Sequence, residues 1–117
     1  MAETALTITT PGNQWSTEGA AVTMDALDNA NGNKFAAKRL ALVIAHNTDA
    51  SPHFVQITSQ PLANTGRTGS VNEELAAGEI RAFLVTRDGW ANAADEVLLP
   101  TGQSATIEVG IVDLTNF

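Results

Sequence analysis

Apolar residues fall in short runs along this chain, and clusters of Gly, Pro, Asn and Asp separate one run from the next. The runs are rich in Val, Ile, Leu and Thr, which favour strands over helices. The pattern predicts strands over residues 5–9, 21–24, 39–46, 53–58, 70–75, 80–86, 96–99 and 105–113. Many short strands separated by turns are typical of an all-β fold, so we expect a small β-sandwich or a jelly-roll-like barrel.

Two of the predicted strands carry further information. In the last one, Ile and Val alternate with other residues from Ile107 to Ile111, which predicts an inward face, and Gly110 leaves room on the other face. Residues 39–45 are apolar at nearly every position, which favours a strand covered on both faces. A turn-rich linker follows this strand, so we expect it to form a hairpin-like pair with residues 53–58.

The beginning of the chain differs in character from the rest. Turn-forming residues cluster at 10–14 and 28–33, with little apolar sequence between them. We therefore divide the chain into an extended N-terminal arm, residues 1–20, and a β-sandwich domain, residues 21–117. A chain of 117 residues can bury one core without metal or disulfide staples.

Composition excludes several classes of protein. The absence of cysteine excludes a disulfide scaffold, a thiolate nucleophile and a thiolate zinc site. The net charge is -7, so we expect neither nucleic acid nor an anionic membrane as a partner. The longest apolar run, residues 40–45, is far shorter than the roughly 20 residues that span a bilayer. The start of the sequence lacks the features of a secretory signal, so we expect a soluble protein made in a cytoplasm.

The charges are distributed unevenly along the chain. Residues 1–33 hold four acids and no base, residues 34–87 hold all six bases, and residues 88–117 hold five acids and no base. One interpretation is that net charge simply favours solubility. The other is that the acidic N-terminal segment meets the basic middle of the same chain or of a neighbouring copy. Under the second interpretation Arg67, Arg81 and Arg87 are candidates for contacts to acids of a neighbour.

Candidates for catalysis and metal binding are few. His46 and His53 flank Asp49, so a site of two histidines and one carboxylate can be drawn, but the linker offers no further ligand and we favour ordinary turn residues. Asp25 and Asp28 precede an Asn-Gly turn whose register lacks the first and last acids of a calcium loop, so we favour a plain turn over a looser calcium site. We expect no catalytic residue, no metal and no cofactor, and the protein is predicted not to be an enzyme.

Two tryptophans lie in polar surroundings, Trp15 in the predicted arm and Trp90 after an Asp-Gly turn signal. Each either caps the end of the sandwich core or anchors an interface, because tryptophan is favoured at both kinds of position. We keep both residues as interface candidates.

From Asp28 onward, the order of motifs resembles a family of small virion proteins of tailed bacteriophages, the capsid decoration or cement proteins. The motifs are an Asn-Gly turn, an apolar strand ending in Asn, a Val-x-Ile-Thr strand, an Ala-Gly-Glu turn and a C-terminal strand of Val and Ile. In this chain they are Asn31 to Phe35, Leu40 to Asn47, Val55 to Thr58, Leu75 to Glu79 and Ala105 to Val112.

The resemblance implies a β-sandwich that binds the outer surface of a phage capsid and stabilises the shell by tying neighbouring capsid subunits together. Its partners would be the major capsid protein and further copies of itself, with a trimer favoured, and its place would be the outer capsid surface of the virion. The alternative is a carbohydrate-binding or host-attachment module that uses Trp90 with Asp88, Asn92 and Asp95 as a sugar site.

Overall fold

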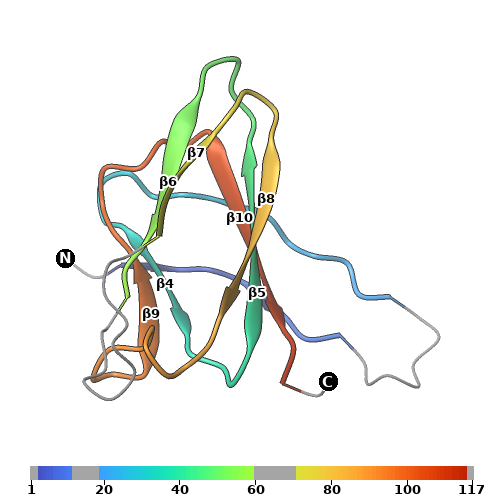
Figure 1. Ribbon diagram of the computed structural model, residues 1–117, viewed down its shortest axis with the longest axis vertical. Coiled ribbons are helices and arrows are strands. Elements are labelled where there is room, and N and C mark those ends of the chain that lie inside the picture. The colour runs from blue at the N-terminus through green and yellow to red at the C-terminus, as the bar shows by residue number, and fades with distance from the viewer. Residues whose placement is uncertain (1–2, 12–18, 60–70, 116–117) are drawn as a thin grey trace.

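The computed structural model describes residues 3–11, 19–59 and 71–115, and within them the chain is built of strands and loops without a helix (Figure 1). The strands are β1 (Thr4–Ala5), β2 (Ile8–Thr9), β3 (Asp25–Ala26), β4 (Asn33–Ala36), β5 (Ala41–Asn47), β6 (His53–Ile57), β7 (Val71–Leu75), β8 (Ile80–Val85), β9 (Glu96–Leu99) and β10 (Ile107–Asp113). None of the described segments is a helix that could cross a membrane.

One layer of the fold is a five-stranded sheet with the order β2-β10-β5-β8, and β3 also pairs with β10. The long strands β10 and β5 form its centre and run antiparallel, with Val109 opposite Ala45. β8 pairs antiparallel with β5, while β2 pairs parallel with β10. β8 therefore lies at the edge of this sheet.

The other layer combines the three-stranded sheet β1-β4-β9 with the hairpin β6-β7. These two pieces meet where the backbone N–H of Thr58, just after β6, donates to the carbonyl of Leu98 in β9 at 2.9 Å. The Gln103 side chain continues the contact, since it bonds both the N–H and the carbonyl of Gln56 in β6. The two layers enclose one core, and the predicted all-β sandwich is confirmed.

The core follows from the alternation of side chains along each strand. In β5 every second residue is fully buried, and the same holds for β10 from Ile107 to Ile111. The second layer contributes the large buried residues Phe35, Val55, Ile57, Leu75, Val97 and Leu99. Burying each side chain of this size stabilises the fold by roughly 1.5–3 kcal/mol. The prediction that residues 39–45 are covered on both faces is therefore wrong, because residues 40, 42 and 44 are only partly buried and residue 39 is exposed.

Two expectations about the strands are wrong, one about which strands pair and one about where a strand lies. β5 and β6 do not form a hairpin, because β5 lies in the five-stranded sheet and β6 in the other layer. The linker between them crosses from one layer to the other. Strand β4 begins at the end of the predicted turn cluster 28–33, where the sequence predicted no strand, since Phe35 is its single large apolar residue.

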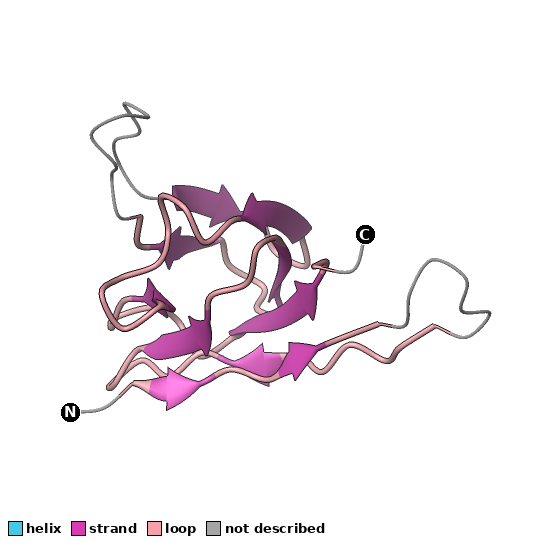
Figure 2. Cartoon of the chain, turned by 90° about the horizontal axis from the view of Figure 1, so that it is seen from below, coloured by secondary structure: helices cyan, strands magenta, loops and turns pink. Residues whose placement is uncertain are grey.

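The N-terminal segment belongs to both layers. β1 pairs parallel with β4 in one layer and β2 pairs parallel with β10 in the other, and Leu6 between them is buried at 5% exposure. The predicted boundary at residue 20 is therefore misplaced, because part of the predicted arm is integral to the sandwich. The described residues 10–11 and 19–21 instead project away from the sheets (Figure 2).

Candidate interaction surface

The outward side of the five-stranded sheet carries large apolar side chains. Ile80 and Leu84 of β8 are 62% and 61% exposed, because alternate residues of this strand point away from the core. Leu42 lies opposite Leu84, and Val112 lies opposite Leu42, so all three share one face of the sheet. Ile44 lies on the same face opposite Ala82. We call Leu42, Ile44, Ile80, Leu84 and Val112 the outer apolar face.

The middle of the sheet is overlain by the chain just before β3. A Cβ added at Gly110 would come within 2.6 Å of Met24 Sδ and 2.7 Å of Val22 Cγ1. The space that Gly110 leaves is thus filled by these two side chains, and only glycine allows them to approach so closely. Residues 21–24, predicted as a strand, are an extended segment beside the outer apolar face, and Val22 is itself 37% exposed.

The candidate arginines that the structure describes pair with acids of their own chain. Arg81 Nε lies 2.9 Å from Glu79 Oε2 and Arg81 Nη1 lies 3.2 Å from Glu73 Oε2, which links β8 to β7 in the opposite layer. The Glu79 carboxylate raises the pKa of Arg81. The pKa of Glu79 is lowered, mainly by the hydrogen bond from the Ala76 backbone N–H and next by the bond from Arg81. Glu73 and Glu79 belong to the same middle segment as Arg81, so these contacts do not join an acidic end of the chain to its basic middle.

Arg87 has a similar environment. Its Nε lies 3.0 Å from Asp95 Oδ1, and its Nη2 donates to the carbonyl of Ala37 at 3.2 Å. Arg67 lies outside the described residues. The prediction that these arginines meet acids of a neighbour therefore has no support from Arg81 or Arg87, whose partners are already supplied.

Trp90 is a core residue, because only 5% of it is exposed and it belongs to the main hydrophobic cluster. A side chain so buried offers little surface to a neighbouring protein or a sugar, and its burial agrees with the core-capping interpretation. Asn92 Oδ1 accepts the backbone N–H groups of Ala94 and Glu96, so it also supports the local turn. Trp15 lies outside the described residues.

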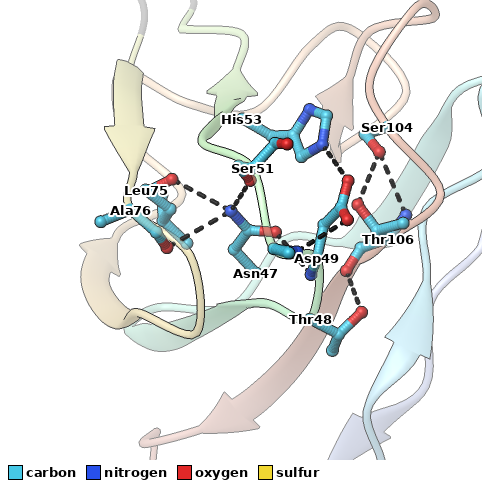
Figure 3. Close-up of polar contacts among 10 residues, drawn as sticks. Asn47, Thr48, Asp49, Ser51, His53, Leu75, Ala76, Ser104 and Thr106 are labelled. Carbon is cyan, nitrogen blue, oxygen red and sulfur yellow. Dashed lines mark hydrogen bonds and ion pairs between the residues drawn. The ribbon is translucent and has the colours of Figure 1, made fainter.

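A buried asparagine organises the crossover between the layers (Figure 3). Asn47 is fully buried at the end of β5, and its Nδ2 donates to the carbonyls of Ser51, Leu75 and Ala76 at 2.9 to 3.3 Å. Its Oδ1 accepts the N–H of Asp49 at 3.0 Å. Sequence reasoning did not single out this residue, although an asparagine that ends a long apolar strand was the available signal.

The histidines are not brought together into a metal site. His53 Nε2 lies 2.7 Å from Asp49 Oδ2, and this bond is the first cause that lowers the pKa of Asp49 (Figure 3). His46 is instead on β5, opposite Glu108 and Ile80 of the five-stranded sheet. Among residues 3–11, 19–59 and 71–115, no group of three potential ligands could hold a metal ion.

The aspartates of the proposed calcium turn are occupied by their own chain. Asp28 accepts the Thr4 hydroxyl at 2.6 Å and the backbone N–H groups of Ala30 and Asn31, and these bonds lower its pKa to about 2, with Thr4 the largest cause. Asp25 accepts the backbone N–H of Thr7 at 2.7 Å. Asp28 fixes the N-terminal segment to the turn before β4 and Asp25 fixes it to β3, which agrees with a plain turn.

Comparison with protein-family models, with curated proteins and with solved structures finds no match to this chain. The resemblance to capsid decoration proteins therefore stays a prediction.

Proposed function

We propose that this chain is a virion structural protein that binds the outer surface of a phage capsid and ties neighbouring capsid subunits together. The observation that supports the proposal most is the outer apolar face, in which Ile80 and Leu84 each expose about three-fifths of their surface. Large aliphatic side chains gathered on one exposed surface mark sites of association with another protein.

The shape of this surface favours a macromolecular partner. The outer apolar face lies on the extended strands β5, β8 and β10, so it offers a broad sheet surface. Small ligands are bound in concave sites that bury most of their surface, whereas protein partners commonly cover about 800 Å² on each side. A neighbouring protein subunit is therefore the occupant that this surface fits.

The projecting segment adds a second place of contact. Residues 10–11 and 19–21 extend beyond the sandwich, and at the base of this extension the N–H of Thr23 donates to the hydroxyl of Thr9 at 3.5 Å (Figure 2). A protein that contacts one capsid subunit through its sheet and another through an extension links the two. A molecule that binds the assembled shell and not the free subunits favours assembly by its binding free energy.

Co-sedimentation tests this proposal. The chain is mixed with assembled shells of the major capsid protein encoded near its gene, and with the same capsid protein kept unassembled. We expect the chain to sediment with shells, to saturate at a fixed ratio, and to raise the temperature at which the shells dissociate. Absence of binding to shells, or a gene neighbourhood without capsid, portal and protease genes, would contradict the proposal.

Two matched substitutions locate the contact. Leu84→Gln places an amide on the outer apolar face, while Phe54→Gln does the same at a 49% exposed residue of β6 in the other layer. We expect Leu84→Gln to weaken shell binding at least tenfold and Phe54→Gln to leave it within twofold. The reverse ranking would place the contact on the opposite layer.

A further inference from the structure

The outer edge of β8 has unpaired backbone groups. β8 is the last strand in the order β2-β10-β5-β8, and no strand of the described residues pairs with its other side. Natural proteins usually protect such an edge with a charge, a proline or a bulge, because an open edge recruits another strand. β8 reads Ile-Arg-Ala-Phe-Leu-Val, and its one charged residue, Arg81, is paired with Glu79 and Glu73.

The pairing of β5 determines which backbone groups of β8 face outward. In an antiparallel pair, opposite residues alternate between those that exchange hydrogen bonds and those that do not. The Asn47 N–H donates to the carbonyl of Glu79, one step beyond the His46–Ile80 pair. Every second residue after Glu79 has the same orientation, so Arg81 and Phe83 direct their backbone N–H and C=O groups toward β5.

The hydrogen bonds between β5 and β10, on the opposite side of β5, lead to the same orientation for β8. The Leu114 N–H donates to the carbonyl of Leu40, one step beyond the Asp113–Ala41 pair, so the even-numbered residues of β5 bond to β10 and the odd-numbered ones to β8. Ile80, Ala82 and Leu84 therefore direct their N–H and C=O groups away from the sheet. These three residues form a row of donors and acceptors at the edge that no strand of residues 3–11, 19–59 or 71–115 bonds.

We infer that this edge pairs with the β8 edge of a second copy of the chain, antiparallel, around a two-fold axis at Ala82. Ala82 then faces Ala82 of the second copy, and Ile80 faces Leu84 of the second copy, with these residues exchanging the backbone hydrogen bonds. The two five-stranded sheets become one continuous sheet across the pair. Such a contact is isologous, since the same surface is used by both copies.

Side-chain size and charge select this register. On the outward side, the large residues Ile80 and Leu84 meet each other and the small Ala82 meets itself, so the two strands are complementary. On the inward side, Arg81 lies opposite Phe83 of the second copy, where a cation and an aromatic ring attract. A shift of the second copy that centres the axis on Arg81 would place two like charges opposite each other, which is unfavourable.

The pairing also extends the outer apolar face from one copy into the next, because Ile80 and Leu84 lie at the junction. The inference does not depend on capsid binding, since it follows from the edge itself. It specifies a two-fold contact in place of the trimer that the family resemblance implies.

Sedimentation equilibrium of the full chain tests the inference. We expect a concentration-dependent equilibrium between the 12.2 kDa chain and a species of twice that mass. Ala82→Pro removes the outward N–H without removing a bond to β5, a position where an edge strand tolerates proline. We expect this variant to be a monomer at every concentration, and the control Ala82→Ser, which keeps the N–H, to dimerise as the wild type does.

Amide hydrogen exchange in the wild type provides a second measurement that needs no variant. At high concentration we expect the N–H groups of Ala82 and Phe83 both to be protected. On dilution below the dissociation constant, we expect exchange at Ala82 to accelerate at least tenfold while Phe83 stays protected by β5. A wild-type monomer or trimer at all concentrations, an unchanged dimer in Ala82→Pro, or exchange at Ala82 that does not respond to dilution would overturn the inference. If shell binding fails while the dimer forms, only the proposed function is contradicted.

Discussion

The two outward sides of the sandwich are built by the same alternation of side chains, yet they differ in chemistry. On the layer that contains β4, β6, β7 and β9, the outward positions include the Lys34–Glu96 ion pair at 3.3 Å and the exposed Asn72 and Glu74, beside the exposed Phe54. On the five-stranded sheet, the outward positions hold the outer apolar face, and His46 and Glu108 lie at one end of it beside Ile80. Folding requires only the inward sides to be apolar, so we expect the proposed partner to cover the outward side of the five-stranded sheet.

The largest effects are expected on the inward side. Ile57→Ala in the fully buried β6 position leaves a cavity and should lower the free energy of unfolding by about 2–5 kcal/mol. Leu84→Ala on the outer apolar face should change it by less than about 1 kcal/mol in the monomer. Urea unfolding at a dilution where the chain is monomeric measures both. Equal losses would mean that Leu84 supports the fold and would contradict its role as a contact residue.

The crossover between the layers should be the next most sensitive place. Asn47→Ala leaves the carbonyls of Leu75 and Ala76 without their side-chain donor, at a cost of about 1–3 kcal/mol. The matched control Asn72→Ala, at an exposed position of β7, should cost less than about 0.5 kcal/mol. Urea unfolding measures the free energy of unfolding of both variants. A loss for Asn47→Ala no larger than that for Asn72→Ala would mean that other groups hold the crossover.

The segment over the five-stranded sheet should respond to Gly110→Ala. The new Cβ would lie too close to Met24 Sδ and Val22 Cγ1, so residues 22–24 must shift, at a cost of about 1 kcal/mol or more. We expect NMR shift changes at residues 21–26 while the buried positions of β6 and β7 keep their shifts. Gly78→Ala is not a matched control because Gly78 has a φ of +74°. Gly19→Ala is the control, because its new Cβ meets no atom within 4 Å and should leave the free energy of unfolding unchanged.

The smallest effect is expected from acid, and it should come from groups outside the outer apolar face. The pKa of Asp28 is lowered to about 2 from its ordinary 3.8, first by the Thr4 hydroxyl, so its contribution is complete above about pH 4 and is lost as pH falls toward 2. Thr4→Val removes the largest cause and should make unfolding less sensitive to pH between 4 and 2. Urea midpoints at pH 6, 4, 3 and 2 measure this, and an unchanged profile would contradict the assignment.

Strand positions could be predicted from the sequence where alternation was strong. β9 begins and ends where the pattern placed it, and β10 lies within the predicted segment. β4 was missed because a short strand with only Phe35 as a large apolar residue gives little periodic signal. The sequence also placed β6 in the wrong layer, since the composition of a linker does not distinguish a hairpin from a crossover between layers.

The candidate surface was beyond sequence reasoning for a physical reason. β8 is apolar at five of its six positions, so its composition does not reveal which side is buried. Exposure of Ile80 and Leu84 follows from the place of β8 at the edge of the sheet, which is a property of the tertiary structure. The same limit explains Trp90, whose polar sequence neighbours hid its burial in the core.

Hydroxyl-radical labelling of the free dimer and of the same chain bound to assembled shells tests most directly whether the outer apolar face is the contact. Oxidation of Ile80 and Leu84 should fall at least fivefold on binding, while oxidation of Phe54, exposed on the other layer, should stay within twofold of its free value. Loss of labelling at Phe54 with unchanged labelling at Ile80 and Leu84 would contradict the account.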